Sequence, residues 1–453
     1  MEVSMLTTEQ AARIVGGVCR GQSVAFTRVV TDSRTVQAGD LFVALRGEHF
    51  DGNAFSAGAL CAGAAAVMVD VSCATDIAPA VVVADTRLAL GQLAADWRQR
   101  MPAKLAAITG SSGKTSVKDM LAAIVRAAVG DAALCVTPGN LNNDIGMPLT
   151  LLGLRPQHQY AVIEMGMNHA GELDYLSHLA RPDWVLINNA GQAHVGLLGS
   201  VAAVAQAKGE IIAGCAPTST VALNADDIYC AMWRELAGAR QVLTFGLAQS
   251  ADVRGRYVAT EDGCRLRIMF AGDEIEVSLP VPGRHNAMNA LAAATLAAAM
   301  GMSLAAIQTG LQTFVSAPGR LQIRILPNGT RLIDDSYNAN PESVHAAIDV
   351  LAGYAGRRVL VLGDMGELGN ASEAAHTGVG EYAKSRGIDT LMAMGHDSQL
   401  AIRVFGVGGQ HFDDIVDLVD ALRPQLTAEA TVLIKGSRFM RMERVVEMLE
   451  GSA

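Results

Sequence analysis

No apolar run in this sequence is long enough to cross a membrane. The nearest candidate is the alanine-rich segment 291–300, which has about half the length that a membrane-spanning helix needs, and we interpret it as a helix inside a protein core. The first residues, Met1–Leu6, also lack the basic start and the apolar stretch of a secretion signal. We therefore expect a cytoplasmic protein with no membrane insertion.

Paired cysteines are missing as well. The seven cysteines are scattered along the chain and odd in number, and no two of them form a C-x-x-C motif. This pattern excludes a disulfide framework and a cysteine-based zinc site. We expect reduced thiols whose side chains behave as small apolar groups.

Blocks of lysine or arginine are absent too. The chain has 35 of these residues against 45 aspartates and glutamates, and its net charge is -10. A general nucleic-acid partner requires a basic surface that neutralises phosphates. The acidic balance therefore argues against nucleic acid as a partner, while local basic groups remain free to bind single phosphates.

The sequence does contain ample apolar material. Half of the 453 residues are hydrophobic, 46 are glycine and 18% are charged, so the chain can bury sizeable cores and is not disordered. Its length corresponds to about three domains. A helix that ends near Pro102 and a turn at Ser316–Arg320 divide it into the expected domains 1–102, 103–315 and 316–453.

The most informative stretch is an apolar strand, 105–108, that runs into a glycine-containing turn. Glycines let backbone amides close around phosphate oxygens, Lys114 adds a cation, and Thr115 can place its hydroxyl on Mg²⁺. The helix expected after the turn directs its N-terminal partial positive charge at the same anion. We predict a phosphate-binding loop made of Gly110, Ser111, Ser112, Gly113, Lys114, Thr115 and Ser116.

This loop is shorter than the general pattern G-x-x-x-x-G-K-[ST]. Ile108 stands where the first glycine would be, so the match is to G-x-x-G-K-T. The alternative is a glycine turn that joins a strand to a helix and leaves a lysine exposed. Strand, loop and helix follow in the order that the motif requires, which favours the phosphate loop.

Apolar strands recur after this loop, with helical segments between them, at 160–163, 184–187, 220–223 and 242–245. This alternation predicts a parallel sheet covered by helices on both faces. Polar residues follow the strand ends, where open α/β sheets bind ligands. Glu164 follows the first of these strands and is a candidate Mg²⁺ ligand; the alternative for a single glutamate is a helix cap.

The pattern changes twice towards the C-terminus. Alternating residues predict an antiparallel meander at 253–258, 265–270 and 275–279. Short apolar segments then predict a doubly wound, Rossmann-like unit at 332–333, 359–362, 391–394 and 432–434. No G-x-G-x-x-G fingerprint follows its first strand, so we do not expect a nicotinamide cofactor. The expected fold class is α/β, with a central parallel-sheet domain flanked by a small N-terminal α/β domain and this Rossmann-like domain.

Several single residues allow two interpretations. Ser33 and Arg34 follow a strand of the N-terminal domain and can hold a diphosphate, or they form a capped turn with a surface arginine. His194 lies in a polar loop and can position a second metal or a phosphate, although a single histidine is usually structural. Lys208 is either a surface lysine or a neutral amine that adds CO₂ to become a carbamate, an anionic Mg²⁺ ligand. The residues alone do not decide among these interpretations.

Taken together, the motifs resemble those of the Mur ligase family of peptidoglycan synthesis. They span nearly the whole chain in the order TGSSGKTS, EMG, NNAGQAHVGLLGS, AKGEI, PGRHNAMN, APGR, DDSYNANPES, VLGDMGELG and KGSR. The shortened phosphate loop is usual in this family. The segments DDSYNANPES and VLGDMGELG resemble most closely the member that joins D-alanyl-D-alanine to a UDP-N-acetylmuramoyl-tripeptide.

The resemblance implies a monomeric, ATP-dependent amide ligase. In such a reaction the terminal carboxylate of the tripeptide takes the γ-phosphoryl group of ATP, and the amine of the dipeptide displaces phosphate. A carboxylate is a poor electrophile and an acyl phosphate is a good one, so the enzyme positions three substrates and neutralises phosphoryl charge. The third residue of the tripeptide cannot be inferred from the sequence.

The resemblance also implies roles for the matching residues. The catalytic residues are Lys114, Glu164, His194 and Lys208. One Mg²⁺ is bound by Thr115 and Glu164, and a second by His194 and carbamylated Lys208. Besides the phosphate loop, ATP contacts Asn289, Arg320, Asp335 and Tyr337. The UDP-muramyl substrate contacts Ser33, Arg34, Asp51, Gly52, Asn140 and Asn143.

Two alternatives remain open. The first is another amide ligase of the same superfamily, which adds diaminopimelate, lysine or glutamate; the chain lacks the D-N-P-R segment associated with the diaminopimelate-adding ligases. The second is a nucleotide-binding switch that ligates nothing. A switch has less need of a second metal site, so Glu164, His194 and Lys208 together argue against it.

Overall fold

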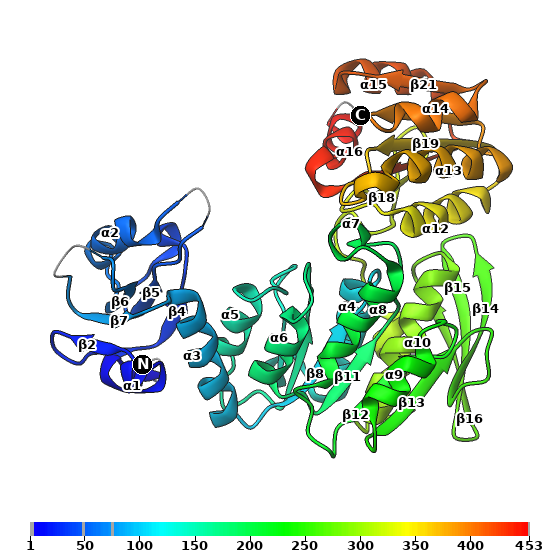
Figure 1. Ribbon diagram of the computed structural model, residues 1–453. Helices are drawn as coiled ribbons and strands as arrows, with labels where there is room; N and C mark the ends of the chain where they lie inside the picture. The colour runs from blue at the N-terminus through cyan, green and yellow to red at the C-terminus, as the bar shows by residue number, and fades with distance from the viewer. Residues whose placement is uncertain (1–3, 48–49, 74–76, 452–453) are drawn as a thin grey trace.

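The computed structural model describes residues 4–47, 50–73 and 77–451, which form three α/β units. The N-terminal unit, blue in Figure 1, lies beside the central unit, and the C-terminal unit, yellow to red, lies above the other side of the central unit. The first three residues of the N-terminal segment interpreted above lie outside the described residues. In the described part of the chain, no helix is both long and apolar enough to cross a membrane.

The N-terminal unit is built on a small mixed sheet. The strands follow in the order β2 (Val18–Arg20), β7 (Ala80–Val83), β6 (Ala66–Asp70), β5 (Asp40–Val43) and β4 (Arg28–Val30). Its helices are α1 (Thr8–Ile14), α2 (Ser56–Cys61) and α3 (Thr86–Arg100), and β1 (Leu6–Thr7) pairs separately with β3 (Ala25–Phe26). Asp85 caps the start of α3, because its side chain accepts hydrogen bonds from the backbone amides of Arg87 and Leu88. The helix α3 then packs on α5 and α6 of the central unit.

The central unit contains one long sheet. Its strands are β8 (Lys104–Thr109), β9 (Leu134–Val136), β10 (Tyr160–Glu164), β11 (Trp184–Ile187), β12 (Thr220–Asn224), β13 (Gln241–Gly246), β14 (Val253–Thr260), β15 (Gly263–Phe270) and β16 (Asp273–Leu279). They lie in the order β16-β15-β14-β13-β12-β11-β8-β10-β9, and β8 to β13 are parallel. The predicted antiparallel meander is present as β14 to β16, and it extends this same sheet because β14 pairs parallel with β13.

Helices cover both faces of the central sheet, as predicted. They are α4 (Lys114–Val129), α5 (Gly146–Leu152), α6 (Glu172–Ala180), α7 (Val195–Leu198), α8 (Val201–Gly209), α9 (Cys230–Ala237), α10 (Arg284–Ala299) and α11 (Leu304–Gln312). One core lies between the sheet and α4, α10 and α11, and another between the opposite face and α5, α6 and α8. Eleven residues of α10 are buried, which explains why this helix is rich in alanine.

The C-terminal unit is doubly wound, as predicted. Its strands lie in the order β17 (Gln322–Ile325), β18 (Arg331–Asp335), β22 (Ala430–Lys435), β19 (Arg357–Gly363), β20 (Thr390–Met394) and β21 (Gly409–Phe412). All pairs are parallel except β17 with β18. The helices α12 (Pro341–Ala352), α13 (Ser372–Ser385), α14 (Gln399–Phe405), α15 (Ile415–Leu422) and α16 (Glu443–Glu450) flank the sheet. Separate apolar clusters fill the two faces.

Three strands of these two sheets were not predicted from the sequence: β9, β17 and β21. Each lies at the edge of its sheet. Edge strands are covered less completely, and these three are short with mostly half-buried side chains. Their sequences therefore lack the continuous apolar run by which the inner strands were identified.

Candidate active site

The phosphate loop lies where the strand order of the central sheet reverses. The strand β8 has β10 on one side and β11 on the other, so the loop after β8 opens at a topological switch point of the sheet. The helix α4 begins directly after this loop, at Lys114. Its buried face is Val117, Met120, Leu121, Ile124 and Val125, which have helical spacing and anchor the helix on the sheet.

Gly113 is the residue whose identity the loop geometry restricts most. Its φ of +78° lies in the left-handed region, and a Cβ atom there would lie 2.3 Å from Asn289 Oδ1 and 2.6 Å from Asn188 Nδ2. Any other residue would meet both a strained backbone and a steric clash. The second glycine of the shortened motif is therefore required by tertiary packing as well as by the turn.

Asn188 and Asn189, directly after β11, hold the loop from the neighbouring strand. The side-chain amide of Asn188 donates hydrogen bonds to the Ser112 carbonyl oxygen at 3.0 Å and to Asn289 Oδ1 at 2.9 Å. Asn189 Oδ1 accepts a hydrogen bond from the backbone amide of Ser112 at 2.9 Å. These two asparagines were not among the predicted site residues. Their position after a buried strand, at the same sheet edge as Glu164, was the available signal.

Lys114 lies at the start of α4 and is only partly exposed. Its ammonium donates to Gly110 O at 2.7 Å. Burial lowers the pKa of Lys114 from its ordinary value, Arg320 lowers it further, and the nearby carboxylates of Glu164 and Glu367 oppose this shift. The ammonium therefore lies within a mixed charge environment at the loop, where an anionic phosphate would favour its charged form.

Thr115 and Glu164 bring a hydroxyl and a carboxylate together beside the loop. Thr115 Oγ1 donates to Glu164 Oε2 at 2.9 Å, and Arg320 Nη2 donates to Thr115 Oγ1 at 3.0 Å. Asn142, a further residue that sequence analysis missed, donates to Glu164 Oε1 at 2.6 Å. Oxygen atoms of this kind, next to phosphate-binding amides, fit the ligand preference of Mg²⁺.

His194 and Lys208 both belong to the central unit, His194 directly before α7 and Lys208 within α8. His194 precedes α7, has a φ of +64°, and places Nδ1 3.0 Å from Glu367 Oε2 of the C-terminal unit. Lys208 is 1% exposed, and no carboxylate among the described residues forms an ion pair with it. Burial, with a further effect of nearby Lys114, lowers the pKa of Lys208 well below its ordinary value. A lowered pKa favours the unprotonated amine, which is the form to which CO₂ adds when a carbamate forms.

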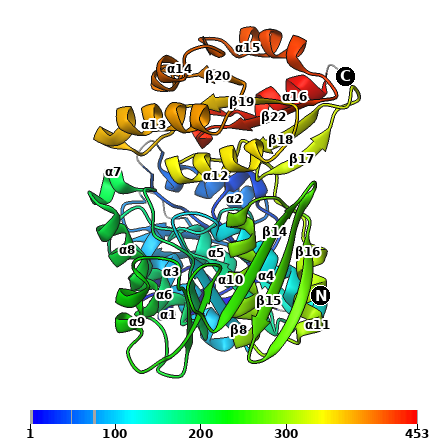
Figure 2. The same cartoon turned by 90° about the vertical axis from the view of Figure 1, so that its right-hand side faces the viewer.

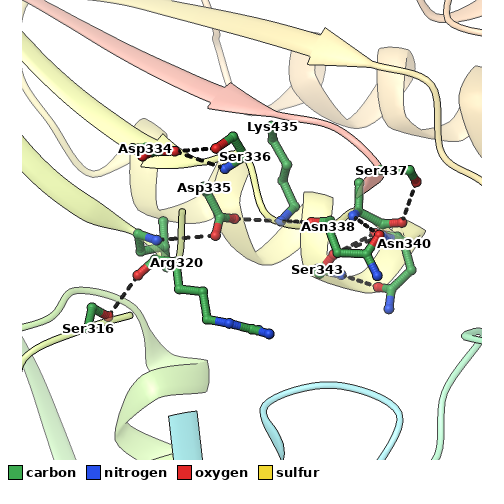
Figure 3. A network of polar contacts seen from close by, with 12 residues as sticks. Ser316, Arg320, Asp334, Asp335, Ser336, Asn338, Asn340, Ser343, Lys435 and Ser437 are labelled. Carbon is green, nitrogen blue, oxygen red and sulfur yellow. Dashed lines mark hydrogen bonds and ion pairs between the residues drawn. The ribbon is translucent and has the colours of Figure 1, made fainter. Parts of the chain in front are cut away.

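The C-terminal unit contributes a polar network at the ends of β18 and β22 (Figure 3). Lys435 Nζ donates to Asp335 Oδ2 at 2.5 Å and to Asn338 O at 2.9 Å. Figure 3 shows the Arg320 side chain extending from this network towards the central unit, and its guanidinium lies 4.2 Å from the centre of the Tyr337 ring. The candidate ATP contacts of this unit are thus brought together at one sheet edge.

A cavity of about 1190 Å³ lies between the central and C-terminal units. Small-molecule sites usually measure about 300–1,000 Å³, so this one can hold a nucleotide and part of a second ligand. The predicted site residues that line it are Ser111, Ser112, Gly113, Lys114, Thr115, Ser116, Asn140, Glu164, His194, Asn289, Arg320, Asp335 and Tyr337. Gly110, Asn143 and Lys208 also belong to the central unit but do not line the cavity.

The candidate residues of the N-terminal unit lie away from this cavity. Arg34 pairs with Asp32 at 2.7 Å, and its hydrogen bonds lower the pKa of that carboxyl to about 2. Asp51 caps the short 3₁₀ helix Gly52–Phe55 by accepting the Asn53 amide. These contacts give Arg34 and Asp51 local partners within the N-terminal unit in this conformation.

Family models match three successive parts of the chain. The Mur ligase family catalytic domain matches residues 25–98, the Mur ligase middle domain matches 108–297, and the Mur ligase glutamate ligase domain matches 319–438. The three matches follow the order of the three units and include the phosphate loop and all labelled residues of Figure 3 except Ser316.

Individual relatives match along the whole chain. The UDP-N-acetylmuramoyl-tripeptide--D-alanyl-D-alanine ligase of Escherichia coli is 44% identical over 98% of both chains. A crystal structure of MurF from Acinetobacter baumannii has a TM-score of 0.92 and 35% identity, with 99% of this chain and 100% of that chain covered. MurF ligase from Thermotoga maritima, solved in complex with ADP, has a TM-score of 0.84 and 26% identity, with 94% and 97% covered.

Proposed function

The chain belongs to the Mur ligase family, and we propose that it joins D-alanyl-D-alanine to a UDP-N-acetylmuramoyl-tripeptide in an ATP-dependent reaction. The observation that carries this proposal is the 44% identity to the Escherichia coli ligase of that name over 98% of both chains. The product is a UDP-muramyl-pentapeptide, an intermediate of peptidoglycan assembly. We further propose that the protein acts in the cytoplasm as a monomer, with the functional domains 1–102, 103–315 and 316–453.

The proposed reaction has two chemical steps. A carboxylate oxygen of the tripeptide attacks the γ-phosphorus of ATP, the bond to the β-phosphate oxygen breaks, and ADP leaves. The dipeptide amine then attacks the acyl carbon, a C–N bond forms, phosphate leaves and the nitrogen loses a proton. Both steps depend on close positioning of the reacting groups and on neutralisation of phosphoryl charge.

The residues around the phosphate loop suit the first step. Lys114 and the loop amides would hold the β- and γ-phosphates, and Arg320, 3.0 Å from Thr115 in this conformation, would move onto phosphate oxygens. Asn289, Asp335 and Tyr337 would contact the rest of the nucleotide. The ADP-bound relative supports a nucleotide in this fold.

Two metal positions are proposed. Thr115 and Glu164 would hold one Mg²⁺, and His194 and carbamylated Lys208 would hold the other. Bound Mg²⁺ would offset the negative charge of the phosphates during transfer. The 2.9 Å contact between Thr115 and Glu164 and the lowered pKa of Lys208 support these assignments.

The UDP-muramyl substrate is proposed to extend from the loop after β9 to the N-terminal unit. Its candidate contacts are Ser33, Arg34, Asp51, Gly52, Asn140 and Asn143. Asn140 lines the cavity, whereas Asn143 Oδ1 accepts the Gly146 amide at 2.8 Å and so fixes the start of α5. Asn143 would then act mainly by shaping the loop that carries Asn140.

A product assay by mass spectrometry tests the proposal. Purified protein is incubated with ATP, Mg²⁺, a UDP-muramyl-tripeptide and one amine at a time: D-alanyl-D-alanine, D-alanine, diaminopimelate, L-lysine or glutamate. We expect a product that has gained the mass of the dipeptide minus water, and phosphate release that requires both substrates.

The same assay separates the alternatives. A product with diaminopimelate, lysine or glutamate in place of the dipeptide would assign the chain to another branch of the amide ligases. Nucleotide binding without phosphate release in any mixture would support a nucleotide-binding switch. Either result would overturn the proposed function.

A further inference from the structure

A contact between His194 and Glu367 joins the central unit to the C-terminal unit. His194 Nδ1 lies 3.0 Å from Glu367 Oε2, and the His194 side chain is 18% exposed. Both residues have left-handed backbones, with φ of +64° at His194 and +63° at Glu367. Non-glycine residues adopt this conformation at a cost in free energy, so both sides of the contact keep a strained backbone where glycine would remove the strain.

The segment that carries His194 is held by the C-terminal unit at further points. A Cβ atom on Gly196 would lie 2.7 Å from Glu367 O and 3.2 Å from Gly369 N, so the two backbones meet at this glycine. Glu342 Oε1 accepts the Gln192 amide at 2.8 Å. Figures 1 and 2 both show α7 projecting from the central unit towards the C-terminal unit.

Glu367 places a carboxylate oxygen 3.0 Å from one ring nitrogen of His194, and its own side chain is 59% exposed. A carboxylate next to one ring nitrogen of a histidine fixes the ring orientation and leaves the other nitrogen for a metal or a phosphate.

We propose that Glu367 is a positioning residue for His194: it holds Nδ1 from the C-terminal unit, so that Nε2 can bind the second metal. This inference rests on the proposed metal role of His194. It implies that the second metal site forms fully only when the C-terminal unit lies against α7. The alternative is an ion pair between two units whose glutamate is 59% exposed and which has no role at the metal, and surface pairs contribute little to stability.

Metal affinity is the direct test. Mn²⁺ is titrated into the protein with a non-hydrolysable ATP analogue and followed by electron paramagnetic resonance, which needs neither the muramyl substrate nor the dipeptide. We expect two sites in the wild type. Glu367→Ala should weaken the second site about tenfold or more, the effect typical of removing a carboxylate behind a ligating histidine. Glu367→Gln, which keeps a side-chain oxygen of the same reach and loses only the charge, should recover most of this loss.

A double variant distinguishes positioning of His194 by Glu367 from independent effects of the two residues on Mn²⁺ affinity. His194→Ala should weaken the second site, and the double variant with Glu367→Ala should bind Mn²⁺ no more weakly than His194→Ala alone. The matched control is Glu373→Ala, which removes an exposed glutamate of the same unit that has no ion pair among the described residues, and it should leave both sites unchanged.

A glycine variant distinguishes loss of the contact with His194 from loss of folding stability. Glu367→Gly removes the carboxylate and relieves the left-handed strain, so its thermal midpoint should match or exceed that of the wild type while its second site is weakened. An unchanged second site in Glu367→Ala, or additive losses in the double variant, would overturn the positioning role. An unchanged second site in His194→Ala would overturn the metal role itself, and the product assay above would still test the ligase activity.

Discussion

The Thr115 hydroxyl donates a 2.9 Å hydrogen bond to the Glu164 carboxylate, although 49 positions separate the two residues in the chain. The contact follows from the pairing of β8 and β10, in which Glu164 lies opposite Ile108. Parallel neighbours place their carboxyl ends at one edge, so a residue at the end of β10 meets the helix that follows β8. The sheet therefore builds the proposed magnesium position.

Replacing Lys114 with alanine should abolish most turnover and leave the fold intact. The ammonium lies at the phosphate loop, 2.7 Å from Gly110 O, and its charge would act on the transferred phosphoryl group. Loss of one such electrostatic group typically lowers kcat by about 10²–10³-fold. Phosphate release measures the rate and circular dichroism measures the fold. Near-normal turnover would contradict the assignment of the phosphate loop.

Replacing Lys208 with alanine should remove activity that short carboxylates restore in part. The variant leaves a space where formate or acetate can supply the anionic oxygen that a carbamate would provide. Phosphate release is measured with and without these anions, with chloride at equal ionic strength as the control. Full activity of Lys208→Ala without any added anion would rule out the carbamate.

Replacing Lys208 with methionine should stabilise the protein at neutral pH. The pKa of Lys208 is lowered in the folded state by burial and by Lys114, so the unfolded chain binds more protons between that lowered pKa and the ordinary lysine pKa. The lysine therefore reduces the free energy of unfolding at neutral pH, and this penalty shrinks as the pH rises through that window. Urea unfolding in bicarbonate-free buffer at pH 7 and near pH 10 should show a larger advantage of the methionine variant at pH 7.

Replacing Gly113 with alanine should abolish nucleotide binding. The new Cβ would clash with the amides of Asn188 and Asn289, which hold the loop, in addition to straining a left-handed backbone. Gly171→Ala is the matched control, because Gly171 also precedes a helix, has a φ of +87° and a ψ of -16° close to the +78° and -3° of Gly113, and has nothing within 4 Å of a Cβ atom. The control should lose only about 1 kcal/mol of stability from backbone strain and keep its ADP affinity, measured by calorimetry. Equal ADP affinity of both variants would contradict the packing argument.

The three units should close when substrates bind. Ser33, Arg34, Asp51 and Gly52, four of the candidate muramyl contacts, lie on the N-terminal unit, whereas Asn140 lines the cavity between the other two units. We therefore expect the units to approach one another when one ligand contacts both groups. Small-angle scattering should show a smaller radius of gyration with nucleotide and UDP-muramyl-tripeptide than with nucleotide alone. Identical profiles would contradict closure.

Much of the architecture could be predicted from local patterns. The inner strands of the central and C-terminal sheets are continuous apolar runs, and the structure confirms them at β8, β10 to β13, β18 to β20 and β22. Edge strands β9, β17 and β21 were missed because half-buried positions accept mixed residues. The meander was predicted, but its place at the end of the central sheet depends on the pairing of β13 with β14.

Local sequence patterns also identified a part of the candidate site. Lys114, Thr115 and Glu164 stand next to strand ends, so their local sequence indicated their chemistry. Asn142 and Glu367 were missed because each acts on a residue far away in the chain, Glu164 and His194 respectively. Nothing in the sequence near either residue indicates such a partner.

Local sequence patterns were enough to predict the fold class, the phosphate loop and the family resemblance, because periodic burial, turn chemistry and short motifs involve consecutive residues. The three-dimensional structure was needed to show that Arg320 reaches Thr115, that Lys208 is buried without a carboxylate partner among the described residues, and that Glu367 lies beside His194. These relations depend on how separate units pack, and packing brings together side chains whose separation along the chain carries no local signal.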